Sequence, residues 1–226
     1  MSATPPRRSD SESGTAPAKL APGRPKDLAK RASILDAAKQ MFTQHGFDGV
    51  SMDQIAAAAG VSKLTVYSHF GDKEALFVEA VRGVCEELMP DLFVADLDGA
   101  LREQLTAIAN AFFRMITSDA ALSTHRMMLT QSSDVRVREM FWQAGPQRVQ
   151  EAFSAFLQAR ADKGELDMPD IRRAASQFFC LLKGELHMRM ASGLGGKPAQ
   201  AEIDAHIAAT VDFFLRAYAS NGRRAP

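Results

Sequence analysis

Apolar side chains recur at helical spacing along most of the chain after residue 30, and alternating strand patterns are absent. The first stripe has members at i, i+1, i+4, i+7 and i+8, which are Ile34, Leu35, Ala38, Met41 and Phe42. Gly46 follows as the expected left-handed residue that ends this helix. Ser51, Ser62 and Asp72 then stand where the N-caps of three further helices are expected. The pattern predicts an all-α fold that opens with four short helices.

Residues 52–70 have the spacing of a helix-turn-helix. Such a motif needs a small residue on its first helix, a turn residue that accepts positive φ, and an apolar anchor on its second helix. Counted from Met52, these are Ala56, Gly60 and Val66, at the fifth, ninth and fifteenth positions. The spacing predicts that the helix after Ser62 lies in the major groove of DNA.

The outward face of that second helix is polar, and no carboxylate occurs from residue 55 to residue 70. A carboxylate there would be repelled by phosphates. Lys63 and Thr65 lie near the N-terminal end of the helix, where they can reach base edges or phosphates. Tyr67 and His69 can donate hydrogen bonds to phosphate oxygens. As alternatives, Tyr67 fits a half-buried core position and His69 fits a structural one.

The rest of the chain is predicted to form a second, larger helical region. Its expected helices cover residues 99–117, 121–130, 135–163, 169–191 and 201–219. The glycine–proline pair at 145–146 should bend the longest of them, because proline lacks a hydrogen-bond donor and clashes with the preceding turn. Gly164 is expected to end that helix.

Composition narrows the class of protein. The 226 residues carry a formal net charge of zero and are 46% hydrophobic, so a sizeable core can form and DNA contact must be local rather than a basic coat. Cys85 and Cys180 are too few for a disulfide framework and indicate a reducing cytoplasm. No apolar run approaches the roughly 20 residues of a membrane span, and no secretory signal is evident, so no membrane partner is expected. The histidines and cysteines form no metal-site pattern, and no cofactor is expected.

The segment from Gly60 to Phe70, followed by Asp72 to Leu76, resembles the recognition-helix signature of the TetR/AcrR family of transcriptional regulators. Residues 31–44 and 46–52 resemble the segments that precede that signature in the family. The resemblance implies that Val66 and Phe70 are core residues. It also implies that Lys63, Thr65, Tyr67 and His69 contact DNA and that Ser51 and Lys73 contact phosphates. With Ser62, Leu64, Arg24 and Lys26 added, these residues form the expected DNA-contacting set.

Three further members of this set have alternative interpretations. Leu64 stands where the family often has a small residue, and it either contacts a thymine methyl group or is tolerated there. Arg24 and Lys26 belong either to a DNA-contacting arm or to a solubilising tail.

Residues 141–146, with Arg148 and Val149, resemble an AefR-like subgroup of C-terminal domains within the same family. The expected division is a disordered tail over 1–30, a helix-turn-helix DNA-binding domain over 31–85, an effector-binding and dimerisation domain over 86–220, and a flexible C-terminus over 221–226. The resemblance implies a homodimer in which the last two helices pair with those of a second subunit. The expected interface residues are Leu181, Leu182, Met188, Ile207, Val211, Phe214 and Leu215. In the alternative, both helices bury these side chains within one subunit.

Methionine and aromatic residues in the second region are candidates for an apolar effector pocket, because they shape adaptable sites. They are Phe112, Phe113, Met115, Ile116, Met127, Phe141, Trp142 and Phe178. Ordinary core packing is the alternative for each of them. The expected function is that of a homodimeric repressor on double-stranded operator DNA, released by a small apolar effector. The helix over about 72–89 is the expected link between the domains.

Two other function classes remain open. The first is a regulator of the same fold that answers to oxidants through Cys85, which lies one helical turn after Arg82. The second is a helical enzyme, although no phosphate loop, dinucleotide motif or nucleophile elbow is present in the sequence. Replacing both cysteines by serine separates the first alternative from a ligand sensor, which should keep its full response.

Overall fold

The computed structural model describes residues 25–93, 99–122, 134–194 and 196–220. The helices of these ranges are α1 (Pro25–His45), α2 (Met52–Ala58), α3 (Lys63–Phe70), α4 (Lys73–Leu88), α5 (Pro90–Phe93), α6 (Leu101–Ile116), α8 (Val135–Ala144), α9 (Pro146–Asp162), α10 (Ile171–Ala191) and α11 (Gln200–Tyr218). No strand forms within these ranges, apart from an isolated bridge between Leu166 and Ala219. The predicted all-α fold is confirmed.

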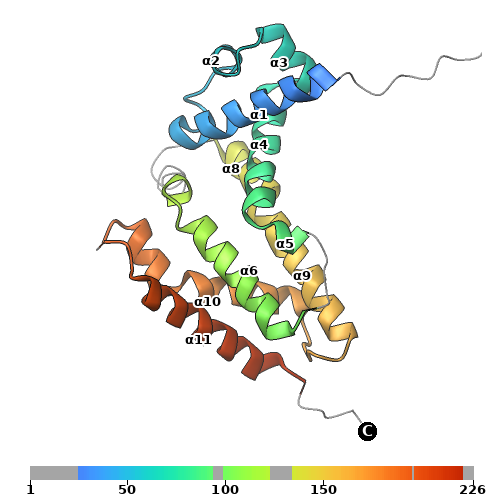
Figure 1. Cartoon of the computed structure of the whole chain (residues 1–226), viewed down its shortest axis with the longest axis vertical. Coiled ribbons are helices and arrows are strands. Elements are labelled where there is room, and N and C mark those ends of the chain that lie inside the picture. The colour runs from blue at the N-terminus through green and yellow to red at the C-terminus, as the bar shows by residue number, and fades with distance from the viewer. Residues whose placement is uncertain (1–24, 94–98, 123–133, 195, 221–226) are drawn as a thin grey trace, which may run out of the picture.

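The helices form two groups that meet along α4 (Figure 1). Helices α1, α2 and α3 gather at one end of the molecule, and α4 runs from them toward α5 and α9. Helices α6, α10 and α11 lie at the other end. In the described ranges, no helix combines the length and the apolarity that crossing a bilayer requires.

Side-chain caps define the short N-terminal helices, as predicted. At the start of α2 the Ser51 hydroxyl accepts the Gln54 backbone N–H, and the Gln54 side chain accepts the Ser51 backbone N–H, which is a capping box. Ser62 caps α3 by accepting the Thr65 backbone N–H, and Asp72 caps α4 in the same way. The three predicted N-caps are confirmed.

The two turn glycines of the first group also have the predicted conformation. Gly46 has φ of 71° and Gly60 has φ of 66°, a region that residues with a Cβ rarely adopt. The turns bring together one buried cluster, composed of Ile34, Ala38, Phe42, Val50, Met52, Ile55, Ala56, Val66, Phe70, Leu76, Phe77, Ala80 and Val137.

Helix α1 begins earlier than the sequence pattern indicated. The expected tail reached residue 30, but α1 begins at Pro25, so residues 25–30 are helical. Proline suits the first helical turn, where its missing N–H has no partner to lose, and Asp27 suits the positive end of the helix dipole. The side chains from Asp27 to Lys30 are exposed. This part of α1 therefore has no buried apolar stripe from which the helix could be predicted.

The expected long helix over 135–163 is two helices. Helix α8 ends at Ala144 and α9 begins at Pro146, with Gly145 between them at φ −118° and ψ −85°. The predicted bend is therefore a full break, and Gly164 ends α9 with φ of 76°, as expected. A Cβ at Gly145 would lie 3.0 Å from a methyl carbon of Val81 on α4, so the glycine permits close approach of the two segments. Of the expected helix over 121–130, residues 121 and 122 are helical, as are residues 119 and 120 before them, and the rest lies outside the described residues.

Helix α10 contains a break that the sequence pattern did not predict. Gly184 has φ of 46° and ψ of −158°, which is outside the helical region. His206 on α11 covers the break, because its Nε2–H donates to the Leu182 carbonyl oxygen at 2.8 Å. The His206 ring also lies 5.7 Å from the ring of Phe113 on α6. The two segments of α10 therefore meet at an angle fixed by a side chain from the next helix.

A second buried cluster fills the larger group of helices. It is composed of Cys85, Met89, Leu92, Leu105, Ile108, Ala109, Phe112, Phe113, Val149, Phe153, Leu157, Leu166, Ala174, Ala175, Phe178, Phe179, Leu182, Leu186, Ile207, Val211 and Phe214. Along α4, Ala80 belongs to the first cluster and Cys85 to the second, so this helix contributes to both cores. Val137 of α8 belongs to the first cluster, so the second region helps to complete the N-terminal core.

Candidate nucleic-acid interface

Helix α3 has one buried face and one exposed face at the end of the molecule remote from α10 and α11 (Figure 1). Val66 and Phe70 point into the N-terminal core. Leu64 is 79% exposed and Tyr67 is 41% exposed on the outer side. Leu64 therefore lies on the surface and not in the N-terminal core, and its contact with DNA stays a prediction.

Lys63 forms an ion pair that the sequence pattern did not indicate. Its Nζ lies 2.9 Å from Oδ2 of Asp53 on α2, and both side chains are largely exposed. The hydrogen bond to Asp53, followed by the charge of that carboxylate, raises the pKa of Lys63. The stretch without carboxylates begins at residue 55, so Asp53 lies just outside it, and the turn of the motif returns it to α3. Because the pair is exposed, a phosphate can compete with Asp53 for the Lys63 ammonium at little cost.

The serine hydroxyls of the expected DNA-contacting set are engaged in helix capping. Ser51 and Gln54 satisfy each other, and the Ser62 hydroxyl lies 2.8 Å from the Thr65 hydroxyl. These bonds leave Ser51 and Ser62 exposed at the helix starts. Contacts of these hydroxyls with DNA stay predictions, and the capping alone explains why serine occurs at both positions.

His69 and Lys73 lie closer to the protein than expected. The His69 side chain is 12% exposed, and its Nε2 lies 2.9 Å from Oδ1 of Asp27 on α1. The Lys73 ammonium lies 4.2 Å from the centre of the Phe47 ring, and burial lowers the pKa of Lys73. The His69 geometry favours the structural alternative, because the side chain is largely buried and its Nε2 is engaged by Asp27. Lys26 lies in the first turn of α1, and Arg24 lies outside the described residues.

The structure brings together part of the expected effector set. Phe112, Phe113 and Phe178 are buried in the second cluster, with Met115 and Ile116 packed against it. The aromatic rings are in close contact, with centroids 4.3 Å apart for Phe112–Phe179 and 4.8 Å apart for Phe153–Phe178.

Two members of that set lie elsewhere, and a third is not among the described residues. Phe141 packs against the N-terminal cluster, because α8 turns its inner face toward α4 and the first core. Trp142, the next residue, is 52% exposed. Met127 lies outside the described residues. The members of the expected effector set that the structure brings together therefore lie on α6 and α10.

The expected interface residues divide between the core and the surface. Leu182, Ile207, Val211 and Phe214 are buried within one protomer, so a second subunit cannot contact them directly, and their assignment to the interface is corrected here. Leu215 is partly buried against the same core. Both helices have two apolar faces, and helical spacing alone does not distinguish the inner face from the outer one.

The outer face of α10 and α11 retains large apolar side chains. Leu181 is exposed, Met188 is 69% exposed, and Phe213, which the sequence analysis did not select, is 55% exposed. Phe213 is next to the buried Phe214. A search for a single apolar stripe along α11 selects only one of these two residues, and it selected Phe214. Exposed apolar groups of this size on adjoining helices are typical of a protein interface.

The cysteines do not form a joint site. Cys85 is buried, and burial, followed by the nearby Glu86 charge, raises the pKa of its thiol to about 11, against a smaller lowering by Arg148. The reactive thiolate is therefore rare at Cys85 near neutral pH, which disfavours the oxidant-sensor alternative at this residue. Cys180 is exposed on α10.

Comparison with known proteins agrees with this geometry. A family model described as "Bacterial regulatory proteins, tetR family" matches residues 34–80, and one described as "AefR-like transcriptional repressor, C-terminal domain" matches residues 103–220. The Mycobacterium tuberculosis HTH-type transcriptional regulatory protein RaaS is 30% identical over 158 residues, which cover 70% of this chain and 69% of RaaS.

Two further relatives extend the comparison. The Bacillus subtilis HTH-type transcriptional regulator YdeS is 29% identical over 148 residues, covering 64% of this chain and 71% of YdeS. The solved structure of the flavonoid-responsive regulator FrrA matches with a TM-score of 0.68 at 32% identity, covering 85% of this chain and 98% of FrrA. This chain therefore belongs to the TetR family of helix-turn-helix transcriptional regulators, with a C-terminal domain of the AefR-like type.

Proposed function

We propose that this regulator is a homodimeric repressor whose two α3 helices bind an operator with two half-sites, and that a small apolar molecule between α6 and α10 releases it. The observation that carries the DNA-binding part is the outer face of α3, where Lys63, Leu64 and Tyr67 are exposed while Val66 and Phe70 anchor the helix. Two such helices in a dimer, about 34–36 Å apart, reach successive major grooves on one side of the duplex.

The support for an apolar effector comes from the aromatic side chains between α6 and α10. Phe112, Phe113 and Phe178 are buried in a cluster of apolar side chains, in which the ring centroids of Phe112 and Phe179 are 4.3 Å apart. FrrA, which is 32% identical, is named for its response to flavonoids, so flat aromatic compounds are the first class to test. A ligand that binds one domain arrangement better than the other shifts the population, and a coupling of about 1–3 kcal/mol is typical.

The dimer part of the proposal predicts a specific loss of association. Met188→Glu combined with Phe213→Glu is expected to convert the dimer to a monomer, because four charged groups would enter the interface in place of apolar ones. Each large side chain contributes about 1.5–3 kcal/mol when buried, so the dissociation constant should rise more than about 100-fold. Sedimentation velocity over a concentration series measures this change.

Trp142→Glu is the matched control for that variant. It introduces one glutamate per chain, against two in the test variant, at an apolar residue of similar exposure on α8, away from α10 and α11. It should leave the dimer intact. A wild-type protein that sediments as a monomer at micromolar concentration, or a double variant that stays dimeric, would contradict the proposed interface.

Selection of bound sites from random duplexes tests the function as a whole. The expected result is enrichment of a two-fold symmetric sequence, followed by release of that duplex when flavonoids or other small apolar compounds are added. Failure to enrich any duplex would contradict DNA binding by α3. If saturating ligand, shown to bind by calorimetry, left operator affinity unchanged, the effector part would be wrong while the operator part remained.

A further inference from the structure

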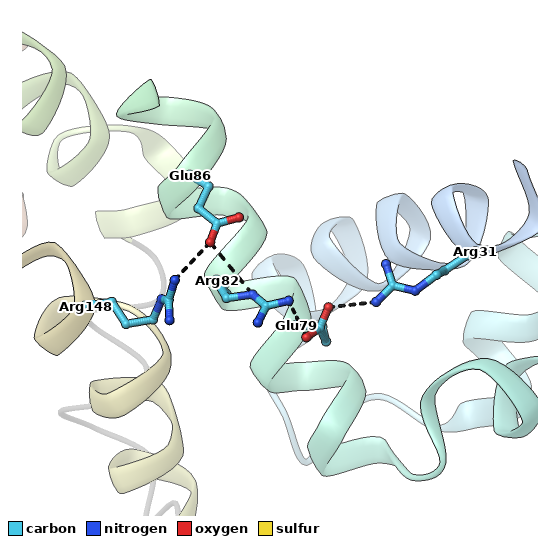
Figure 2. A network of polar contacts seen from close by, with 5 residues as sticks. All are labelled: Arg31, Glu79, Arg82, Glu86 and Arg148. Carbon is cyan, nitrogen blue, oxygen red and sulfur yellow. Dashed lines mark hydrogen bonds and ion pairs between the residues drawn. The ribbon is translucent and has the colours of Figure 1, made fainter. Parts of the chain in front are cut away.

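A line of alternating charges crosses the boundary between the two domains (Figure 2). Arg31 of α1 donates to Glu79 of α4 at 2.8 Å, and Arg82 donates to the other Glu79 oxygen at 2.5 Å. Glu86, one turn farther along α4, lies 3.8 Å from Nε of Arg82 and accepts from Arg148 of α9 at 3.2 Å. We call these five residues the interdomain ion ladder.

Each end of the interdomain ion ladder lies beside a residue of one of the two buried cores. At one end the Arg31 guanidinium lies 4.9 Å from the centre of the ring of Phe70, the last residue of α3 and a member of the N-terminal core. At the other end Arg148 precedes Val149, which is buried in the core of the larger domain. The ladder therefore joins the recognition helix to the wall of the effector domain through α4.

We propose that the interdomain ion ladder positions α4 against α9 and thereby sets the separation of the two recognition helices in the dimer, with Glu86 and Arg148 as positioning residues. The inference rests on the proposed function, because separation matters only to a dimer that binds two half-sites. The ladder therefore affects which half-site spacing the dimer prefers. It does not affect which bases α3 recognises.

The arrangement of Arg82 gives the ladder two alternative states. Arg82 bonds closely to Glu79 and only loosely to Glu86, whose nearer partner is Arg148. If a shift of α9 moves Arg148 away, Arg82 is the ladder cation that remains near Glu86. Movement of Arg82 toward Glu86 then weakens its ion pair with Glu79. The four ladder side chains other than Glu79 are about 40% exposed, so these exchanges avoid the large desolvation cost of buried pairs.

Two further features make the position of α4 sensitive to a shift of α9. Nε of Arg148 is inaccessible to solvent and has no hydrogen-bond partner among the described residues, so this position is not fully satisfied by its surroundings. Close by, Gly145 brings the start of α9 so near to α4 that even a Cβ would lie 3.0 Å from Val81. A shift of the start of α9 is therefore passed to α4 by packing as well as by charge.

Arg148→Gln tests the positioning role. Affinities are measured for duplexes that carry the selected half-sites at spacings varied one base pair at a time, and for a duplex without half-sites. The wild type should prefer one spacing. In the variant this preference over the neighbouring spacings should fall about 3- to 10-fold, while affinity for the duplex without half-sites changes less than about 2-fold. Exposed ion pairs are individually weak, so unfolding should be little affected.

Arg102→Gln is the matched control. Arg102 also bridges two helices, through a 2.5 Å bond to Asp212 of α11, but that pair lies within the larger domain. The control loses the same charge and should keep the wild-type spacing profile. Glu86→Gln should reproduce the Arg148→Gln profile, and Arg148→Lys should restore much of the preference because it retains the charge.

The outcomes separate this inference from the proposed function. If the wild type prefers one spacing and Arg148→Gln shows the same profile, or a uniform loss at every spacing, the positioning role is wrong and operator binding stands. If the wild type binds all duplexes alike, the proposed function itself fails.

Discussion

Lys63→Ala combined with Tyr67→Phe is expected to lower the affinity for the selected operator at least about 100-fold without unfolding the protein. Lys63 and the Tyr67 hydroxyl lie on the exposed face of α3, so neither change opens a cavity. A base or phosphate contact contributes about 1–3 kcal/mol, and a dimer loses each contact twice. A loss of about 1.4 kcal/mol in each half-site already corresponds to about 100-fold in affinity.

Salt dependence shows which kind of contact has been lost. If Lys63 binds a phosphate, Lys63→Ala alone should reduce the slope of log affinity against log salt by about one for each recognition helix. Arg173→Ala, which removes an exposed charge from α10, serves as the control and should leave both affinity and slope unchanged. Wild-type operator affinity in a folded double variant would show that α3 does not read the DNA.

Phe153→Ala is expected to destabilise the protein by about 3–5 kcal/mol, the usual range for deleting a buried aromatic side chain. Phe153 is completely buried, and its ring lies 4.8 Å from that of Phe178 and 4.9 Å from that of Phe179. Removal leaves a cavity among rigid rings from α9 and α10, which collapse poorly. Urea unfolding followed by circular dichroism at a fixed protein concentration measures the change, because dimerisation makes stability depend on concentration.

Leu64→Ala is the control for this prediction. It also truncates a large apolar side chain, but Leu64 is exposed and belongs to neither core. Its effect on unfolding should stay within about 0.5 kcal/mol. A similar midpoint for Phe153→Ala and the wild type would mean that the second cluster does not hold the larger domain together.

Local chemistry made the N-terminal helices predictable. Ser51, Ser62 and Asp72 each bind a backbone N–H within three residues, and the turn glycines need only their own backbone freedom. These effects involve neighbours in sequence, so they can be recognised without knowledge of the fold. The same holds for the break beside Pro146, because proline acts on its own helix.

Interactions between distant residues were not predictable from these patterns. Arg160 is almost fully buried, where it donates to Glu165 at 2.8 Å, to the Gly99 carbonyl at 2.7 Å and to the Gln104 side chain. The pairs Lys63–Asp53 and His69–Asp27 likewise join different helices. Spacing along one helix gives no information about which charge on another helix will meet it.

The choice between inner and outer faces was the main error in the candidate sites. Leu181 and Leu182 are adjacent and chemically identical, yet the first is exposed and the second is completely buried. Helical periodicity shows that α10 has apolar residues on more than one side, but the direction of the core depends on where α6 and α11 pack. Phe213 and Phe214 repeat this ambiguity on α11.

The break in α10 restricts how this chain can change by mutation. Any side chain at position 184 would adopt a backbone conformation reserved for glycine, and its Cβ would lie 2.9 Å from the His206 ring. A substitution at position 184 is therefore tolerated only if α10 straightens. Straightening would rotate the part of α10 after residue 184 relative to Leu181. Met188 would then face a different direction, and the mutant chain would no longer match the unmutated chain as a partner.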